Sequence, residues 1–265
     1  MARIYAITNQ KGGVGKTTSC VNLAASLAAT KRRVLLVDMD PQGNATMGSG
    51  VDKNTTPKTV YDVLMGHADV ASASVYSRDA GFSVLAANGD LTAAEVQMLK
   101  LPNKEQRLLK ALQLVSNLYD YILIDCPPSL NMLTVNALVA CEGVIIPMQC
   151  EYYALEGLSA LINTINQVQA TINPRLKIEG ILRTMYDPRM SLTTDVSAQL
   201  TEFFGDKVYR TCVPRNVRLA EAPSHGKPVL AYDKQSKGAL AYLALAGEII
   251  RQNEAINEPL LDVAP

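Results

Sequence analysis

The stretch RIYAITNQKGGVGKTT, residues 3–18, joins a strand to a helix through a glycine-rich loop. Residues 4–8 are mostly apolar and of strand length, and a helical pattern begins near Lys16. Glycines stand between the two at positions 12, 13 and 15. Because glycine permits backbone conformations that turn successive N–H groups inward, the stretch predicts a phosphate-binding loop at a helix N-terminus.

The loop departs from the standard phosphate-binding pattern, in which four residues separate a first glycine from Gly-Lys-Ser/Thr. Gln10 stands where that first glycine would be. Lys16 and Thr17 still close the motif. The lysine would reach the β- and γ-phosphates of a nucleotide, and the Thr17 hydroxyl would ligate Mg²⁺. Lys11 is surplus to this scheme, and the second lysine is the most informative feature of the loop.

Residues 11–17 resemble the deviant Walker A motif of the ParA/MinD class of P-loop ATPases. Three further segments resemble the chromosome-partitioning ParA (Soj) branch of that class. They are VDMDPQGN at 37–44, ILIDCPP at 122–128 and VPRNVR at 213–218. The resemblance extends from Met1 to about Arg251. It implies a P-loop ATPase that uses ATP and Mg²⁺.

The resemblance also implies a role for the surplus lysine. In this class the residue matching Lys11 reaches the partner's ATP across a nucleotide-sandwich dimer. The protein is therefore expected to be a homodimer when ATP is bound, with Gly12 where the two loops meet and Glu151 at the interface. A helix N-terminus with a favourable acidic charge is the alternative for Glu151. The implied nucleotide-binding residues are Lys11, Gly12, Gly13, Val14, Gly15, Lys16, Thr17, Thr18, Met185, Pro214, Arg215 and Asn216.

Three carboxylates follow apolar, strand-like runs. Asp125 follows four apolar residues, as a Walker B carboxylate does, and would hold Mg²⁺ through water. By resemblance, Asp38 helps to order the magnesium shell, and Asp40 positions or activates the attacking water. The expected metal residues are therefore Thr17, Asp38 and Asp125, and the expected catalytic residues are Lys11, Lys16 and Asp40.

The adenine pocket is also implied by resemblance. Asn216 is expected to hydrogen-bond the edge of the base, and Pro214 is expected to pack on its face. Met185 and Arg215 complete the expected pocket, although a structural turn remains the alternative for Met185.

Apolar runs of strand length alternate with helical patterns along the chain. The runs lie at 3–8, 33–38, 82–86, 121–125, 143–148 and 178–183, and the helical patterns at 16–29, 104–118, 130–140, 154–172, 192–204 and 238–251. Strands that are apolar on both faces and joined by helices predict an α/β, doubly wound, mostly parallel sheet with helices on both faces. Ligands of such sheets bind at the carboxyl ends of the strands, where the loop and the aspartates fall.

A formal net charge of zero conceals an uneven charge distribution. Residues 175–251 hold 12 Lys or Arg against 8 Asp or Glu, a balance of +4. By resemblance, Arg189 and Arg218 are expected to contact the DNA backbone. Solvated arginines are the alternative. The lesser candidates, chosen because they lie in the basic third, are Lys227, Lys234 and Lys237. Backbone contacts carry no sequence information, so nonspecific, salt-dependent binding of double-stranded DNA is expected.

Length and composition fit one ATPase domain over residues 1–265, with 48% hydrophobic residues and a flexible acidic tail from about residue 253. No apolar run approaches the roughly 20 residues of a membrane span. Five cysteines show no C-x-x-C pair or metal-ligand spacing, which favours reduced thiols in a cytoplasmic protein. With DNA as a partner, the expected location is cytoplasmic and nucleoid-associated.

Other enzyme classes fit less well. A MinD-like membrane-associated positioning ATPase needs a basic amphipathic C-terminal helix, yet no Lys or Arg follows Arg251. A nitrogenase-type iron protein needs cysteines that hold a cluster, and Cys126 and Cys141 lie in apolar contexts. A metabolic P-loop enzyme such as an ATP-dependent ligase would need a substrate pocket that no motif indicates.

The predicted function is therefore DNA partitioning driven by ATP. The resemblance implies a Mg²⁺-dependent ATPase whose ATP-bound dimer coats DNA and is released on hydrolysis. A ParB-type centromere-binding protein is expected to stimulate that hydrolysis, so turnover by the protein alone should be weak. The loop begins within ten residues of Met1, which favours a chromosomal over a plasmid role.

Overall fold

The computed structural model describes residues 1–152 and 154–257 and is built on one eight-stranded sheet. The strand order is β3-β4-β2-β5-β1-β6-β7-β8, and all neighbours are parallel except β3 and β4. The strands are β1 (Arg3–Ile7), β2 (Val34–Asp38), β3 (Ser74–Ser77), β4 (Phe82–Leu85), β5 (Tyr121–Asp125), β6 (Gly143–Gln149), β7 (Lys177–Tyr186) and β8 (Val208–Pro214).

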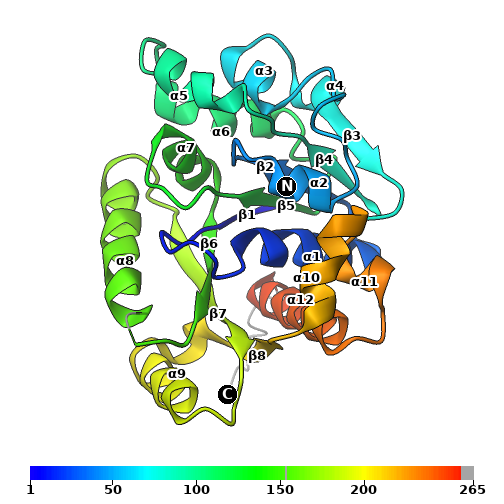
Figure 1. Cartoon of the computed structure of the whole chain (residues 1–265). Helices are drawn as coiled ribbons and strands as arrows, with labels where there is room; N and C mark the ends of the chain where they lie inside the picture. The colour runs from blue at the N-terminus through cyan, green and yellow to red at the C-terminus, as the bar shows by residue number, and fades with distance from the viewer. Residues whose placement is uncertain (153, 258–265) are drawn as a thin grey trace, which may run out of the picture.

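Two sets of helices cover the two faces of the sheet (Figure 1). On one face lie α1 (Lys16–Ala29), α10 (Val217–Glu221), α11 (Val229–Tyr232) and α12 (Lys237–Asn257). On the other lie α3 (Val60–Met65), α4 (Val70–Ala73), α5 (Leu91–Met98), α6 (Arg107–Gln113), α7 (Met132–Ala140), α8 (Ala154–Thr171) and α9 (Ser191–Phe204). The shorter elements are α2 (Asn44–Gly48) and the 3₁₀ turns η1 (Lys104–Gln106), η2 (Gly205–Lys207) and η3 (Ala222–His225).

The central strands are buried on both faces because their sequences are apolar throughout. Every residue of β2 and β5 is buried, including the aspartate that ends each strand. Asp38 and Asp125 are register partners across these two strands. The doubly wound, mostly parallel fold predicted from the sequence is thereby confirmed, and its core lies in two layers, one on each side of the sheet.

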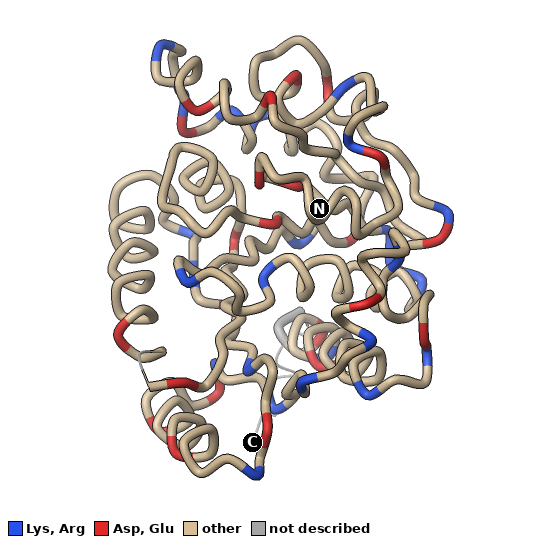
Figure 2. Tube along the Cα trace, viewed as in Figure 1, with Lys and Arg blue, Asp and Glu red and all other residues tan. Residues whose placement is uncertain are grey.

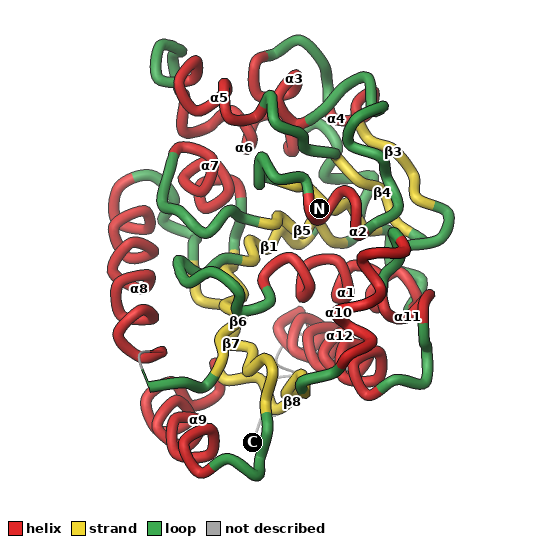
Figure 3. Tube along the Cα trace, in the orientation of Figure 1, coloured by secondary structure: helices red, strands yellow, loops and turns green. Residues whose placement is uncertain are grey.

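The carboxyl ends of the parallel strands meet at one edge, where a loop follows each of β1, β2 and β5 (Figure 3). The loop after β1 runs directly into α1, which begins at Lys16 as the sequence predicted. This arrangement brings the glycine-rich loop next to the aspartates of β2 and β5.

The expected start of a flexible tail near residue 253 is wrong. Helix α12 continues to Asn257, and Asn253 is buried. Its Oδ1 accepts a hydrogen bond from the Tyr5 hydroxyl at 2.9 Å, and its Nδ2 donates to the Tyr121 hydroxyl at 3.2 Å. These buried partners hold the end of the helix against the sheet. The rest of the predicted tail, 258–265, lies outside the described residues.

At the edge of the sheet, the backbone of β8 is covered by a carboxylate from α12. Glu248 accepts hydrogen bonds from the backbone N–H groups of Arg210, at 2.7 Å, and Thr211, at 3.0 Å. The Thr211 hydroxyl donates to it as well, at 2.7 Å. Arg210 and Thr211 lie where the register between β7 and β8 shifts, so Glu248 satisfies two backbone amides in this irregular stretch of the edge strand.

Within residues 1–152 and 154–257, none of the helices combines the length and apolar character needed to cross a membrane.

Candidate active site

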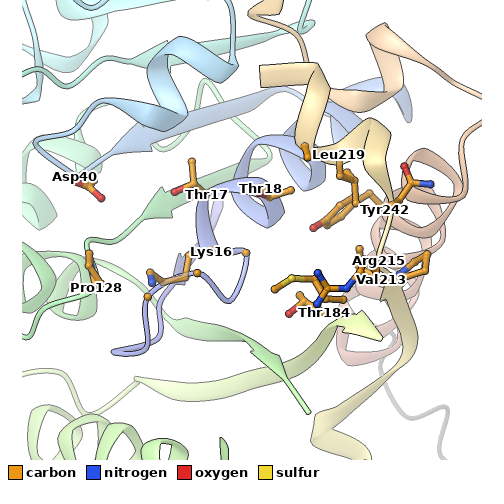
Figure 4. Close-up of a pocket in the computed structure, with 17 residues that line it drawn as sticks. Lys16, Thr17, Thr18, Asp40, Pro128, Thr184, Val213, Arg215, Leu219 and Tyr242 are labelled. Atoms are coloured by element: carbon orange, nitrogen blue, oxygen red, sulfur yellow. The ribbon is translucent and has the colours of Figure 1, made fainter. Parts of the chain in front are cut away.

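A cavity of about 430 Å³ opens at the carboxyl ends of the strands, beside the start of α1. Figure 4 shows Lys16, Thr17, Asp40 and Pro128 toward one end of it, and Leu219, Tyr242, Val213 and Arg215 toward the other. The cavity therefore has a polar end at the glycine-rich loop and a more apolar end at β8 and α12. Its lining comprises Gly12, Gly13, Gly15, Lys16, Thr17, Thr18, Asp40, Pro128, Thr184, Met185, Val213, Pro214, Arg215, Asn216, Leu219, Ala220 and Tyr242.

Glycine conformations and the Asn9 side chain determine the shape of the glycine-rich loop. Gly13 and Gly15 have φ of 74° and 86°, a region that favours glycine, so the sequence places glycine where the loop turns. The Asn9 side chain accepts from the Lys11 N–H at 3.0 Å and donates to the Pro147 carbonyl at 2.9 Å. These contacts fix the loop in a shape that presents N–H groups to an anion.

Lys16 is a buried lysine at the start of α1. Its Nζ donates to the backbone carbonyl of Lys11 at 3.0 Å, so the side chain folds back over the loop. Burial lowers the pKa of Lys16, and the nearby Asp125 carboxylate opposes that shift. A buried ammonium beside a helix N-terminus is suited to hold phosphate oxygens.

Thr17 and Asp125 lie together at the polar end. The Thr17 hydroxyl donates to Asp125 Oδ2 at 2.8 Å, whereas the buried Oδ1 has no hydrogen-bond partner. Burial, and next the charge of Asp38, raises the pKa of Asp125 well above its ordinary value. A buried carboxylate oxygen without a partner fits a cation or its water. Among the residues described, no three His, Cys, Asp or Glu side chains form a metal-binding group. Mg²⁺ sites built on substrate phosphates do not require one.

Asp38 is fully buried and does not line the cavity. Its Oδ2 accepts from the Thr46 N–H at 2.8 Å and from the Thr46 hydroxyl at 2.7 Å, and its Oδ1 accepts from the Asp40 N–H at 3.1 Å. Burial raises the pKa of Asp38 to about 6, and the hydrogen bonds from Thr46 and Asp40 oppose the shift. The predicted role of Asp38 in the magnesium shell stays a prediction.

Asp40 is the partly exposed carboxylate of this group and lines the cavity. Its Oδ1 accepts from the Gln42 N–H at 2.9 Å. Among the three predicted carboxylates, Asp40 alone lines the space where a reacting phosphate would lie. Its position is compatible with the water-positioning role implied by the resemblance.

All four residues expected to form the adenine pocket line the cavity: Met185, Pro214, Arg215 and Asn216. Met185 has φ of 49°, an uncommon value for a residue with a side chain, and such backbone strain is concentrated at functional sites. Asn216 Oδ1 accepts from the Arg218 N–H at 3.0 Å and caps α10. The Nδ2 group of Asn216 is therefore the donor left for a base.

Sequence reasoning missed six lining residues. Thr184 lies next to the predicted Met185, and its hydroxyl supports the loop by donating to the Val14 carbonyl at 2.8 Å. Tyr242 lies within α12, where no local motif marks it, and its hydroxyl is 3.0 Å from the Ser19 hydroxyl. The other missed residues are Pro128, Val213, Leu219 and Ala220. Val14 was predicted to bind nucleotide, but its side chain is buried and does not line the cavity.

The surplus lysine pairs with an acidic residue in the single chain and does not contribute to the cavity lining. Lys11 Nζ pairs with Glu151 at 2.5 Å, and each side chain is close to half exposed, 42% and 44%. Lys11 does not line the cavity. Two of the three residues predicted for the dimer interface, Lys11 and Glu151, are thus brought together within one copy.

The candidate DNA-binding residues are exposed or partly exposed, and three of them are paired with carboxylates. Arg189 pairs with Asp187 at 2.7 Å, Arg218 with Glu221 at 2.8 Å, and Lys227 with Asp79 at 3.3 Å. Lys234 and Lys237 are exposed. Figure 2 shows Lys and Arg concentrated around β8, α10, α11 and α12, with acidic segments between them.

Comparison of the sequence with known proteins gives relatives over nearly the whole chain. A family model described as an AAA domain matches residues 2–178. Sporulation initiation inhibitor protein Soj of Bacillus subtilis is 53% identical over 249 residues, 94% of this chain and 98% of that protein. Chromosome partitioning protein ParA of Caulobacter vibrioides is 50% identical over 250 residues, 94% of this chain and 94% of that protein.

Two solved structures share the fold. Cobyrinic acid a,c-diamide synthase of Mycobacterium smegmatis, with bound ADP and magnesium, is 37% identical with a TM-score of 0.85 over 97% of each chain. The cell division ATPase MinD of Pyrococcus furiosus is 27% identical with a TM-score of 0.78, over 95% of this chain and 100% of that chain.

Proposed function

This chain belongs to the ParA/Soj family of chromosome-partitioning ATPases, and from that membership we propose that it binds and hydrolyses ATP with Mg²⁺ as a homodimer on DNA. The observation that supports this most directly is the cavity itself. It joins a glycine-rich loop, a buried Lys16 and Asp40 at one end to a more apolar lining, including Val213, Leu219 and Tyr242, at the other.

The chain's own residues divide the work of phosphoryl transfer. The loop N–H groups and Lys16 bind the phosphates, and Met185, Pro214 and Asn216 hold the base. Asp40 orients the attacking water. Thr17 and Asp125 would hold Mg²⁺, because Asp125 Oδ1 lacks a partner, and the ion would neutralise charge on the phosphates. Positioning and charge stabilisation suffice because phosphoryl transfer to water requires little covalent chemistry.

The dimer supplies what one copy lacks. In the single chain Lys11 is paired with Glu151 outside the cavity, so a second lysine can reach the phosphates only by breaking that pair. We assign Lys11 to the partner's ATP, and Gly12 and Glu151 to the interface. A Cβ added to Gly12 meets no atom within 4 Å in one copy. A defect of Gly12→Val in dimer formation would therefore report the approach of the partner.

DNA binding is assigned to Arg189 and Arg218, with Lys227, Lys234 and Lys237 in support. Arg189, Arg218 and Lys227 already face carboxylates, so phosphates would replace Asp187, Glu221 and Asp79 as their partners. Contacts of this kind read no sequence. A ParB-type protein would stimulate weak basal hydrolysis, and the ATP-bound dimer would reside on the nucleoid in the cytoplasm.

The experiment that tests this proposal is binding to random-sequence duplex DNA with ATP, ADP or no nucleotide, over a range of salt. Tight, salt-sensitive binding only with ATP is expected, with loss in Gly12→Val and Arg218→Ala. Arg33→Ala is the matched control, because Arg33 is also an exposed arginine paired with a carboxylate, Asp120. Binding that ignores the nucleotide would contradict the proposal.

A second measurement addresses the other enzyme classes. The M. smegmatis structure is of a protein named as a diamide synthase, which points to ATP-dependent amide formation. ATP turnover that requires a carboxylic acid and an amide donor, and that DNA and a ParB-type protein leave unchanged, would favour that class. ATP-dependent binding to anionic vesicles would favour a MinD-like role. Fast turnover by the protein alone would contradict stimulation by a partner.

A further inference from the structure

We propose that Thr46 is a positioning residue for ATP hydrolysis, because its hydroxyl fixes the segment that carries Asp40. The inference rests on the proposed ATPase function. Thr46 lies in the short helix α2 and is fully buried, and it does not line the cavity. It therefore touches neither the phosphates nor the base, and any effect on the reaction passes through its neighbours.

The Thr46 hydroxyl is both a donor and an acceptor. It donates to Asp38 Oδ2 at 2.7 Å and accepts from the Ala87 N–H, just after β4, at 3.0 Å. The other oxygen of Asp38 accepts from the Asp40 N–H at 3.1 Å. A continuous chain of hydrogen bonds thus runs from the end of β4, through Thr46 and Asp38, to the backbone of Asp40. We name this chain of contacts the Thr46 clasp.

A close backbone approach reinforces the clasp. Gly43 has φ of 63°, and a Cβ added there would lie 2.7 Å from the Ala87 carbonyl oxygen. Ala87 therefore binds Thr46 through its N–H and packs on Gly43 through its carbonyl. A further contact holds the middle of the segment, where Lys53 Nζ donates to the Gln42 carbonyl at 2.6 Å. The segment between Asp38 and Thr46 is anchored on both sides of Asp40.

The geometry also indicates why a threonine is required. Valine has nearly the shape of threonine, but its side chain can neither donate to Asp38 nor accept from the Ala87 N–H. The link to the end of β4 would be lost, and Asp38 Oδ2 would keep only the bond from the backbone N–H of residue 46, at 2.8 Å. Serine keeps the hydroxyl and both contacts. Because reaction rates depend steeply on the position of a group that orients the nucleophile, release of the clasp should slow hydrolysis without weakening nucleotide binding.

The test compares Thr46→Val, Thr46→Ser and wild-type protein in ATP turnover and in binding of a non-hydrolysable ATP analogue. Thr46→Val is expected to lower kcat by about 10- to 100-fold while analogue affinity stays unchanged, and Thr46→Ser is expected to restore most of kcat. Thr164→Val is the control, because it removes another buried hydroxyl, in α8, that donates only to the Ala160 carbonyl. It should affect thermal stability without affecting kcat.

The outcomes separate this inference from the proposed function. Wild-type kcat in a folded Thr46→Val protein would overturn the positioning role alone, and so would an equal loss of kcat and analogue binding. Absence of turnover in the wild type would overturn the proposed function. If Thr46→Val does not fold, hydrogen exchange of backbone amides in the wild-type protein tests the clasp instead. The Asp40 and Thr46 amides should exchange more slowly than those of the exposed Asn54 and Thr55, and equal exchange would overturn the clasp.

Discussion

At the scale of the residue, Asp125 shows a conflict between stability and activity. Its Oδ1 is buried without a hydrogen-bond partner, and its register partner Asp38 is a second buried carboxylate. A negative charge held there is costly in the nucleotide-free protein. Such a cost is expected where a site must be ready for a cation, because natural proteins keep destabilising groups that function requires.

We predict that Asp125→Asn stabilises the nucleotide-free protein while abolishing ATP hydrolysis. The amide removes the buried charge, although its NH₂ group remains a buried polar group at the place of the unpaired oxygen. We expect removal of the charge to raise the unfolding free energy by about 1–3 kcal/mol. Thermal melting at neutral pH would measure it as a higher Tm. A lower Tm would contradict this account of Asp125.

The raised pKa of Asp125 also predicts how the unfolding free energy depends on pH. The folded-state pKa of Asp125 lies above the ordinary value of 3.8, so the folded protein retains a proton that the unfolded chain releases. The unfolding free energy of the wild type should then fall as pH rises above about 4. Asparagine does not titrate, so the stability advantage of the variant should grow as pH rises above about 4 and level off above the raised folded-state pKa of Asp125. A constant difference across that range would count against a raised pKa.

Lys11 and Glu151 form an ion pair in which each side chain is close to half exposed to solvent. Pairs of this exposure contribute about 0–1 kcal/mol, so the contact can be exchanged at little cost. We predict that Glu151→Gln leaves Tm nearly unchanged, whereas Lys11→Gln abolishes ATP-dependent dimer formation. Thermal melting and light scattering with ATP would measure the two effects. An ATP-bound dimer of Lys11→Gln with normal turnover would exclude a role for Lys11 across the interface.

At the scale of the element, the last turns of α12 depend on buried polar contacts. Asn253 joins the helix to Tyr5 of β1 and Tyr121 of β5. We predict that Asn253→Ala lowers the unfolding free energy by about 1–3 kcal/mol, because both tyrosine hydroxyls lose a buried partner. Denaturant unfolding would measure the change. Glu254→Ala is the control, since Glu254 makes only an exposed ion pair with Arg32, and a loss of equal size there would refute the argument.

Elements with strong local patterns were predictable from the sequence, and those defined by tertiary contacts were not. The glycine loop predicts α1 from its first residue, and the apolar run 121–125 coincides with β5. Strand β8 was missed because Arg210, Thr211 and Pro214 interrupt its apolar pattern, and its pairing with β7 is itself irregular. In the short helix α2, the Thr46 N–H donates to the buried Asp38 carboxylate. The local pattern of apolar and polar residues gives no sign of this contact.

For the candidate site too, residues in contiguous motifs were predictable and residues placed by tertiary contacts were not. Motif residues of the loop and of 213–218 were predictable because each motif is contiguous in the sequence. Tyr242 reaches the cavity only because α12 packs against α1, which places it beside Ser19. Lys11 could be identified as unusual from the sequence, but its pairing with Glu151 within one copy is visible only in the structure.

At the scale of the whole molecule, neutral net charge coexists with a basic C-terminal third, so ionic strength should control its association with nucleic acid. We predict that Arg218→Ala weakens ATP-dependent DNA binding equally on different sequences. It should also reduce the slope of log affinity against log salt by about 1. Fluorescence anisotropy on two unrelated duplexes would measure both. Loss of binding on one duplex only would indicate base reading instead of backbone contact.

The carboxylate of Glu248 has a consequence for assembly. A sheet edge with open amides is a template on which another chain can add a strand. Here, the Arg210 and Thr211 amides already hold charge-assisted hydrogen bonds, which an incoming strand would have to displace. Strand addition at Arg210 and Thr211 is therefore disfavoured, and so is growth of a polymer of copies through this stretch of β8.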